Sequence, residues 1–198
     1  MHVGHSPDQI RWWNAKDEES RRLIVDAMLG CQHRAGMKVE GEDRGVLDLG
    51  SGSARDRDYL MQRFEANYCG IEVVKEAAER TAHLNVRHLA IEEMPSDWNG
   101  KVQFIYSRHV MEHVINLDAA LSAIKRVLAP HGIVGAVTPH VFPDSEPAHV
   151  TVQTLEEWCA HYRRHGLRPV YAKLENMACV EAHIVCIHEE WAARVLGS

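Results

Sequence analysis

The chain carries few of the features that would place it in a membrane, on nucleic acid or outside the cell. No apolar run approaches the roughly 20 residues that a membrane-spanning helix needs. Residues 1–5 lack the apolar core of a secretory signal. Asp and Glu (28) outnumber Lys and Arg (22), and the net charge of −6 disfavours a nucleic-acid-binding surface. We therefore expect a cytoplasmic protein whose partner is neither a membrane nor a nucleic acid.

The cysteines also lack the spacing that is typical of disulfide-rich or metal-binding proteins. The five cysteines are odd in number and form no C-x-x-C pair, so neither a disulfide framework nor a cysteine metal site is indicated. We expect buried free thiols in a reducing compartment. The composition is otherwise that of a globular protein, with 45% hydrophobic and 25% charged residues. This length predicts a single domain over residues 1–198.

What the chain does contain is a glycine turn between a predicted strand and a predicted helix. Residues 46–49 form the apolar run of a buried strand, and Gly50 and Gly52 follow it one residue apart. Leu60 and Phe64 then lie at helical spacing. This order is the opening unit of a doubly wound α/β sheet. Because a ligand can approach backbone that carries no Cβ, we expect a cofactor across this turn. The alternative is an ordinary tight turn that uses glycine for its positive φ.

The spacing of the turn distinguishes between cofactors. The dinucleotide-binding pattern G-x-G-x-x-G would need a third glycine at Arg55. The chain instead has Asp48-x-Gly50-x-Gly52-x-Ala54. This resembles the first motif of the class I S-adenosylmethionine-dependent methyltransferases, (Asp/Glu)-x-Gly-x-Gly-x-Gly. The resemblance implies S-adenosylmethionine (SAM) as cofactor and S-adenosylhomocysteine (SAH) as product. A carboxylate beside the turn suits SAM because it attracts an ammonium group and repels a pyrophosphate.

A second acid stands at the end of the next predicted strand, residues 67–72. Glu72 falls 20 residues after Gly52, where nucleoside-binding folds place the acid that accepts both ribose hydroxyls. NAD and SAM would both use this position, so Glu72 indicates a nucleoside without selecting one. A surface acid at the start of the following helix is the alternative.

Later segments extend the resemblance. Residues 90–95 resemble the family's acid-Ala-Glu-Asp-Leu-Pro segment beside the adenine, but Ala90 stands where the acid is usual. Adenine recognition then falls to the Ile91 backbone or to Glu92. Residues 109–114 resemble the family's His-Val-Leu-Glu-His-Val, and residues 126–134 resemble its Leu-Lys-Pro-Gly-Gly turn. The cofactor-binding residues implied by the resemblance are Asp48, Gly50, Ser51, Gly52, Ala54, Asp56, Glu72, Val73, Ile91, Glu92, Ser107 and Arg108.

The remaining pattern predicts the architecture. Apolar runs predict strands over residues 46–49, 67–72, 85–89, 102–107, 133–138, 167–174 and 182–188. With helices between them, they resemble an α/β, doubly wound, mostly parallel seven-stranded sheet with helices on both faces and a C-terminal antiparallel hairpin strand. The Rossmann-like core would span residues 45–188. Residues 6–34 have helical spacing, and residues 1–40 are expected to form an N-terminal helical lid. The charged run 16–22 is interpreted as a solvated face or as a break between two helices.

The expected reaction is direct, in-line transfer of a methyl group from SAM to an acceptor, with a small molecule as the expected class. A general base is needed only where the acceptor arrives protonated, and a neutral imidazole suits that role. The candidates are His109 and His113. The acceptor-binding candidates are Trp12, Trp13, His140 and His149. For the two tryptophans, core packing of one ring is the alternative.

Three other functions share parts of this pattern. An NAD(P)-linked oxidoreductase would also use the turn and Glu72, but Asp48 and Arg55 disfavour it. A non-catalytic SAM-binding or scaffold relative would keep the fold. Residues 109–113 also fit H-x-x-E-H, a zinc-peptidase signature, but they directly follow a strand instead of lying within a helix, so we expect no metal. The oligomeric state and the identity of the acceptor are left open.

Overall fold

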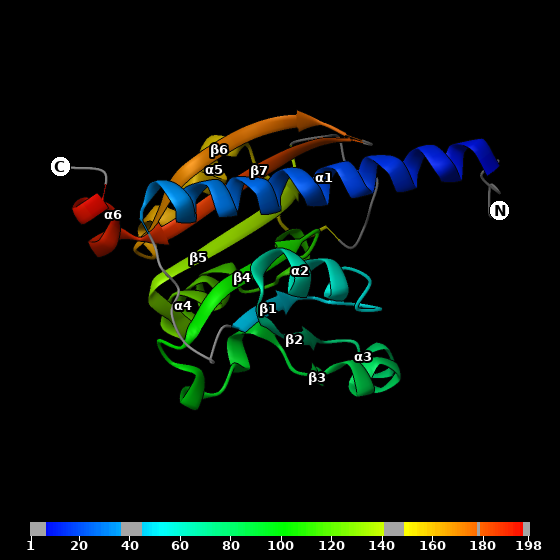
Figure 1. Ribbon diagram of the computed structural model, residues 1–198, viewed down its shortest axis with the longest axis horizontal. Helices are drawn as coiled ribbons and strands as arrows, with labels where there is room; N and C mark the ends of the chain where they lie inside the picture. Colours follow the sequence, from blue (N-terminus) through cyan, green and yellow to red (C-terminus); the bar gives the residue numbers. More distant parts are fainter. Residues whose placement is uncertain (1–6, 37–44, 141–148, 178, 196–198) are drawn as a thin grey trace.

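Seven strands form one sheet in the order β3-β2-β1-β4-β5-β7-β6 (Figure 1). The structure is a computed structural model and describes residues 7–36, 45–140, 149–177 and 179–195. The strands are β1 Gly45–Leu49, β2 Asn67–Glu72, β3 Val86–His88, β4 Val102–Arg108, β5 Leu128–Pro139, β6 Leu167–Asn176 and β7 Val180–His188. The helices are α1 Pro7–Arg34, α2 Arg57–Phe64, α3 Lys75–Thr81, α4 Leu117–Val127, α5 Leu155–Arg164 and α6 Glu189–Val195.

Only β7 runs against its neighbours. The pairs from β3 through β5 are parallel, and β7 lies antiparallel between β5 and β6. The predicted fold class, including the C-terminal hairpin, is therefore confirmed. The antiparallel insertion also brings the first residues of β7 to the carboxyl edge of the parallel strands, where Glu181 pairs with Pro139.

Side chains alternate across the strands and so divide the core into two layers. Val46, Phe104 and Val185 point to the layer that packs against α1, α2, α3 and α6. Leu47 and Ile105 point to the opposite layer, which packs against α4 and α5. Helices on both faces bury the sheet, as a doubly wound fold requires.

The helix ends follow from local sequence. Thr154 begins α5 with a capping box, in which its hydroxyl accepts from the Glu157 N–H and the Glu157 carboxylate accepts from the Thr154 N–H. Asn116 caps α4 by accepting from the Ala119 N–H at 3.1 Å. Each cap satisfies backbone donors that a helix start leaves without partners.

Several strand ends differ from the predicted bounds by one or two residues, and the larger differences are as follows. The charged run 16–22 is not a break, because α1 continues through it from Pro7–Arg34. Strand β5 begins at Leu128, five residues before the predicted start at residue 133. Residues 109–113 contain a 3-10 turn, Met111–His113. Helix α6 had not been predicted.

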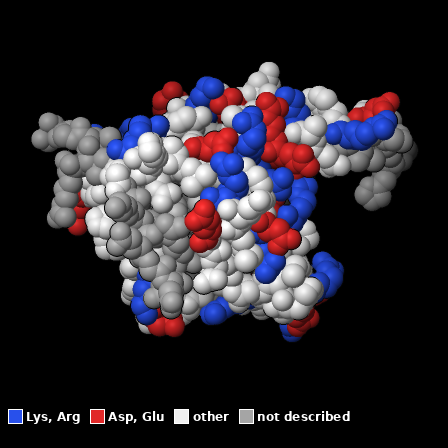
Figure 2. Space-filling model, in the orientation of Figure 1, with Lys and Arg blue, Asp and Glu red and all other residues white. Residues whose placement is uncertain are grey.

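The surface and the thiols complete the description. All five cysteines are free, and Cys31, Cys159 and Cys186 are buried. Within the described residues, no helix is long and apolar enough to span a bilayer. On the face shown in Figure 2, acidic and basic side chains are interspersed over the described part of the surface.

Candidate functional site

The turn after β1 leaves its backbone open on one side. Gly50 and Gly52 have φ of +61° and +53°, in the left-handed region that favours glycine. A Cβ on Gly50 would lie 2.5 Å from Cγ2 of Val110, whereas a Cβ on Gly52 would meet no atom within 4 Å. Gly50 is therefore required by packing, and Gly52 faces free space. Ala54, in the place of the usual third glycine, also has a positive φ, of 55°.

Two cavities meet at Gly50, at the carboxyl edge of the parallel strands. The first, of about 220 Å³, is polar and is lined by Asp48, Gly50, Ser51, Gly52, Ser53, Arg55, Asp56, Tyr106 and Arg108. The second, of about 310 Å³, is mostly apolar and is lined by Gly50, Ile71, Val73, Leu89, Ala90, Ile91, Glu92, Val110, His113, Val114 and Ile115. Three of the predicted cofactor residues, Ala54, Glu72 and Ser107, line neither cavity and are buried. A charged group and an apolar ring system joined in one ligand would fit this pair of spaces.

Glu72 lies where β2 ends and is held by the backbone. Its Oε2 accepts from the Gly52 N–H at 2.9 Å and its Oε1 accepts from the Val74 N–H at 2.8 Å. These bonds fix the carboxylate beside the glycine turn. The residue is only 7% exposed. Each carboxylate oxygen has a second lone pair, so the group can still accept from two hydroxyls.

Asp48 is an acid buried against a phenol. The Tyr68 hydroxyl donates to its Oδ2 at 2.8 Å, and 4% of the residue is exposed. Burial raises the pKa of Asp48 to about 7, and the bond from Tyr68 offsets only part of that rise. The carboxyl therefore titrates near neutral pH, where an ammonium group placed in the polar cavity would draw it to the charged form.

A network of charges joins α1 to the glycine turn. Asp56 accepts from Arg21 at 3.0 Å, from the Tyr106 hydroxyl at 2.9 Å and from Nη2 of Arg108 at 3.1 Å. Burial alone would raise the pKa of Asp56, but these cationic partners, Arg108 foremost, hold it below its ordinary value. Asp17 of α1 pairs with Arg108 and also with Arg55.

Sequence reasoning missed the α1 members of this network. Asp17 and Arg21 had been interpreted as part of a solvated charged run. Their separation of four residues places them on one helix face, which is the only sign that they act together. The sequence holds no information on which surface that face would meet.

His109 is held between carboxylates. Its Nε2 lies 3.1 Å from Oε1 of Glu181, and its Nδ1 lies 3.4 Å from Oε1 of Glu112. Burial alone would lower its pKa, but the two carboxylates raise it to about 9. His109 is therefore charged at neutral pH and unsuited to act as a general base. Glu181, which also binds His183 at 3.0 Å, had not been identified from the sequence.

The acceptor-side candidates lie around the same edge. His113 and His149 have ring centroids 4.8 Å apart. His140 is half-buried and its backbone forms an isolated bridge to Gln153. Trp12 is 48% exposed on α1, and the side chain of Trp13 lies outside the described part, as does the loop 141–148. In Figure 1 the first turns of α1 extend beyond the sheet on the side to which β1 and β2 point.

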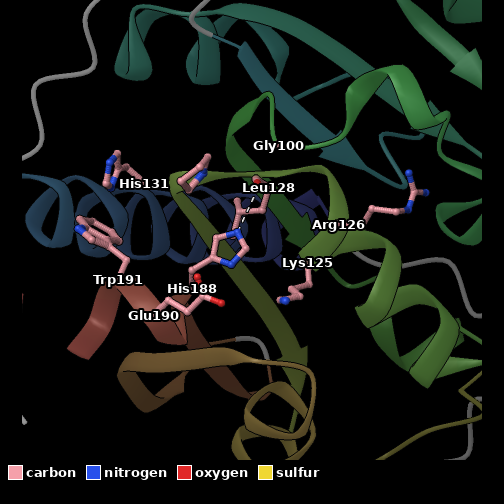
Figure 3. A pocket seen from close by; sticks show the side chains of 9 residues that line it. Gly100, Lys125, Arg126, Leu128, His131, His188, Glu190 and Trp191 are labelled. Carbon is pink, nitrogen blue, oxygen red and sulfur yellow. Dashed lines mark hydrogen bonds between the residues drawn. The ribbon is translucent and has the colours of Figure 1, made fainter. Parts of the chain in front are cut away.

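A larger cavity, of about 540 Å³, lies elsewhere (Figure 3). Its lining comes from Gly100 before β4, from Leu128 at the start of β5 and from His188 at the end of β7, all at the amino edge of the parallel strands. His188 is engaged through Nε2 with the Leu128 carbonyl at 3.1 Å. This cavity is thus at the edge opposite the glycine turn, and open α/β sheets bind their ligands at the carboxyl edge.

The zinc-peptidase alternative does not fit the backbone. That site needs both histidines on one turn of a helix. Here the 3-10 turn covers only Met111–His113, and His109 precedes it with a φ of 55°. His109 faces Glu181 instead of sharing a ligand position with His113.

Comparison with known proteins identifies the family of the chain. A family model described as a methyltransferase domain matches residues 27–175. No curated protein sequence matched the chain. The 1,6-didemethyltoxoflavin-N1-methyltransferase of Burkholderia thailandensis, solved with SAH, aligns with a TM-score of 0.66 at 15% identity over 91% of this chain and 85% of its own.

Two further solved structures show the range of proteins that share the fold. A SAM-dependent methyltransferase from Aquifex aeolicus has a TM-score of 0.60 at 19% identity, over 87% of this chain and 96% of its own. The [4+2]-cyclase SpnF has a TM-score of 0.63 at 14% identity, over 84% of this chain and 80% of its own. At these identities the likeness shows the fold. The family model covers most of the chain, and the protein belongs to the class I SAM-dependent methyltransferases, with SAM as its cofactor.

Proposed function

We propose that the chain transfers the methyl group of SAM directly to a small-molecule acceptor in the cytoplasm. The observation that carries this proposal is the pair of cavities, one polar and one apolar, that meet at Gly50 beside an open glycine backbone. The five free thiols support a reducing compartment.

The polar cavity suits the amino-acid end of the cofactor. Asp48 would accept from the ammonium group, and Arg55 and Arg108 offer guanidinium groups to the carboxylate. Asp56 would act through Arg108, which it holds in place. Gly52 and Ser51 would supply backbone that a ligand can approach.

The second cavity suits the adenosine end. Glu72 would accept from the ribose hydroxyls while the Gly52 and Val74 N–H groups keep it in position. Val73 and Ile91 offer apolar walls for a flat ring, and Glu92 offers a carboxylate at its rim. Because Ala90 stands where the family usually has an acid, the Ile91 backbone or Glu92 would recognise the adenine.

The bound cofactor supplies a methyl group on a sulfonium, which is already an excellent electrophile. The chain's own residues therefore contribute mainly by orienting the two reactants and by excluding water. His113, whose side chain is 41% exposed, remains the candidate base for an acceptor that arrives protonated. Trp12, Trp13, His140 and His149 are proposed to border the acceptor.

Helix α1 is proposed to act as a lid over the polar cavity. Asp17 occupies the two arginines that the cofactor carboxylate would use. The ligand and Asp17 would compete for the same guanidinium groups, so binding would loosen one end of this tie. The helix would stay attached beside the ligand through the ion pair of Arg21 with Asp56, which does not include Asp17.

A calorimetric titration of the full chain with SAM, SAH and NAD⁺ tests the proposal. Micromolar binding of SAM and SAH with no NAD⁺ binding supports it, and NAD⁺ binding alone would refute it. Gly52→Val should abolish SAH binding by filling the space before the turn. Glu72→Ala should weaken it by about 1–3 kcal/mol through loss of charge-assisted hydrogen bonds. Glu79→Ala, an exposed acid on α3, is the matched control.

Transfer itself needs a separate measurement. SAH release should be followed with SAM and a panel of small hydroxyl, amine and carbon-acid acceptors. A chain that binds SAM but releases no SAH across the panel, and that acts instead as a cyclase or a scaffold, would refute the proposed transfer while keeping the cofactor. The fold allows that outcome, since a [4+2]-cyclase shares it.

A further inference from the structure

We propose that Glu112, His113 and His149 bind a divalent transition-metal ion at the carboxyl edge of the sheet, beside the cofactor site. One ligand atom from each of these residues lies within 4.8 Å of the others. Two of the residues belong to the 3-10 turn after β4, and the third follows the loop after β5. This assignment replaces the expectation, drawn from the sequence, that the chain has no metal site.

Backbone hydrogen bonds bring the two segments together. The Glu112 carbonyl accepts from the Val150 N–H at 2.9 Å and from the Thr151 N–H at 3.0 Å. These bonds fix the residue before Val150 next to the 3-10 turn. The rings of His113 and His149 consequently lie 4.8 Å apart at an interplanar angle of 64°.

The Glu112 carboxylate is the observation that points to a ligand. The residue is fully buried, yet neither carboxylate oxygen accepts a hydrogen bond from the described residues. Nδ1 of His109 lies 3.4 Å and Nε2 of His113 lies 4.0 Å from Oε1, so both of these pairs are to the same carboxylate oxygen. The charged His109 offsets part of the cost of burying this carboxylate, and a coordinated cation would engage the oxygen, Oε2, that His109 does not reach.

The donor set indicates the kind of ion. Two imidazoles and one carboxylate suit Zn²⁺, Fe²⁺ or Co²⁺ better than Mg²⁺ or Ca²⁺, which prefer oxygen ligands. The His109 imidazolium would repel an ion, but Glu181, which lies 3.1 Å from it, offsets its charge. The carboxylate of Glu112 has lone pairs enough for His109 and a metal together.

The three ligand atoms must move closer together to bind one ion. Atoms about 2.1 Å from one tetrahedral zinc ion lie about 3.4 Å apart, so the present spread must shrink by about 1.4 Å. Rotation of the His113 and His149 rings provides this movement, because the His113 side chain is 41% exposed and His149 is only half-buried. Glu112 itself would stay fixed in the core.

The position of the site suggests that the ion binds the acceptor, an inference that rests on the proposed function. His113 also lines the apolar cavity that meets the glycine turn. With the ion bound, His113 serves as a ligand and the ion takes over the part of the general base. Three protein ligands leave coordination positions open, as in catalytic metal sites. An acceptor that carries a hydroxyl, phenol or carboxylate oxygen could bind there, lose its proton more easily and be oriented toward the cofactor.

Binding of Co²⁺ to the chelator-treated full chain tests the proposal. Equilibrium dialysis and the visible d–d absorption of the protein should show one saturable equivalent, and Zn²⁺ should displace it. His113→Ala and His149→Ala should each weaken binding at least about tenfold. Glu112→Gln should do the same. His83→Ala, on the exposed turn Ala82–Leu84, is the control and should bind Co²⁺ as the natural chain does.

Two outcomes would overturn the metal site: absence of saturable Co²⁺ binding, or equal affinity in the natural chain and the His113→Ala and His149→Ala variants. Circular dichroism of each variant confirms that it is folded, and the two histidine variants keep the test valid where Glu112→Gln does not fold. SAH calorimetry on the metal-free chain separates the two proposals. SAH binding without Co²⁺ binding refutes the metal site alone, and the reverse refutes the cofactor site alone.

Discussion

The Asp48 carboxyl should make both the stability of the protein and its affinity for SAH depend on pH. Burial raises its pKa from 3.8 to about 7. Because the folded chain holds this proton more tightly than the unfolded chain, the group's contribution to stability is complete below pH 3.8. That contribution is lost progressively as the pH rises to about 7 and is absent above it.

The size of the effect follows from linkage. Each pH unit between the two pKa values costs about 1.4 kcal/mol, so from pH 5.5 to pH 8 this carboxyl alone lowers the free energy of unfolding by about 2 kcal/mol. Asp48→Asn keeps the shape and a carbonyl that accepts from Tyr68, but it does not ionise. The free energy of unfolding of the variant, relative to the natural chain, should therefore rise by about 2 kcal/mol over this range.

Urea unfolding followed by tryptophan fluorescence at pH 5.5, 6.5, 7.5 and 8 would measure the difference. Asp97→Asn, an exposed acid, is the control and should follow the natural chain at every pH. If the Asp48→Asn and natural curves run parallel within about 0.5 kcal/mol, Asp48 is not a buried titrating group and the reasoning is wrong.

The same group predicts how cofactor binding depends on pH. Pairing with an ammonium requires the charged carboxylate, which with a pKa of about 7 is a minor form at pH 6. SAH affinity should rise about fivefold from pH 6 to pH 7 as the ionised fraction grows. Binding at pH 6 should release a proton, which calorimetry in buffers of different ionisation enthalpy detects. Asp48→Asn should bind weakly and without this pH dependence, and a flat profile for the natural chain would contradict the proposed pairing.

Three further predictions concern the network and the helix caps. Glu181→Gln should lower the pKa of His109 from about 9 toward 6.5, as read from the pH titration of its ring protons by NMR, because it removes one of its two carboxylate partners. Asp17→Asn should increase the rate of proteolytic cleavage within α1, since it breaks two ion pairs to the glycine turn, and an unchanged rate would argue against α1 as a lid. Thr154→Ala should lower the free energy of unfolding by about 0.5–2 kcal/mol, whereas Thr154→Ser should retain it.

The sequence predicted the sheet and the glycine turn because both rest on local pattern. An apolar strand, two glycines and a helical spacing lie within about 20 residues of chain, so periodicity alone locates them. Glu72 was predictable for the same reason, since one strand and one turn fix its distance from Gly52. Its exact bonding was not, because the Val74 and Gly52 N–H groups that hold it have no signature in the sequence.

The remaining site residues come from contacts distant in the chain. His109 was expected to be neutral because an isolated imidazole is neutral at pH 7. Its charged state depends on Glu181, 72 residues later, which reaches the same edge only because β7 is inserted antiparallel between β5 and β6. Asp17 and Arg21 likewise depend on how α1 docks, and alternation of side chains predicts which sheet face is apolar but not which helix covers it.

The strand register explains how the polar cavity acquires a titrating acid at all. Asp48 pairs with Gly70 on one side and with Tyr106 on the other. A Cβ on Gly70 would lie 2.6 Å from the Ser51 hydroxyl and 2.8 Å from the Tyr68 hydroxyl. Only glycine at position 70 therefore lets the Tyr68 side chain pass along β2 to reach Asp48 on β1. Tyr106 turns its own hydroxyl to Asp56 instead, so the two acids are kept apart in role. Arginines keep Asp56 charged, so it serves to hold the turn and α1 together. Asp48 has a pKa of about 7, so a cationic ligand can ionise it.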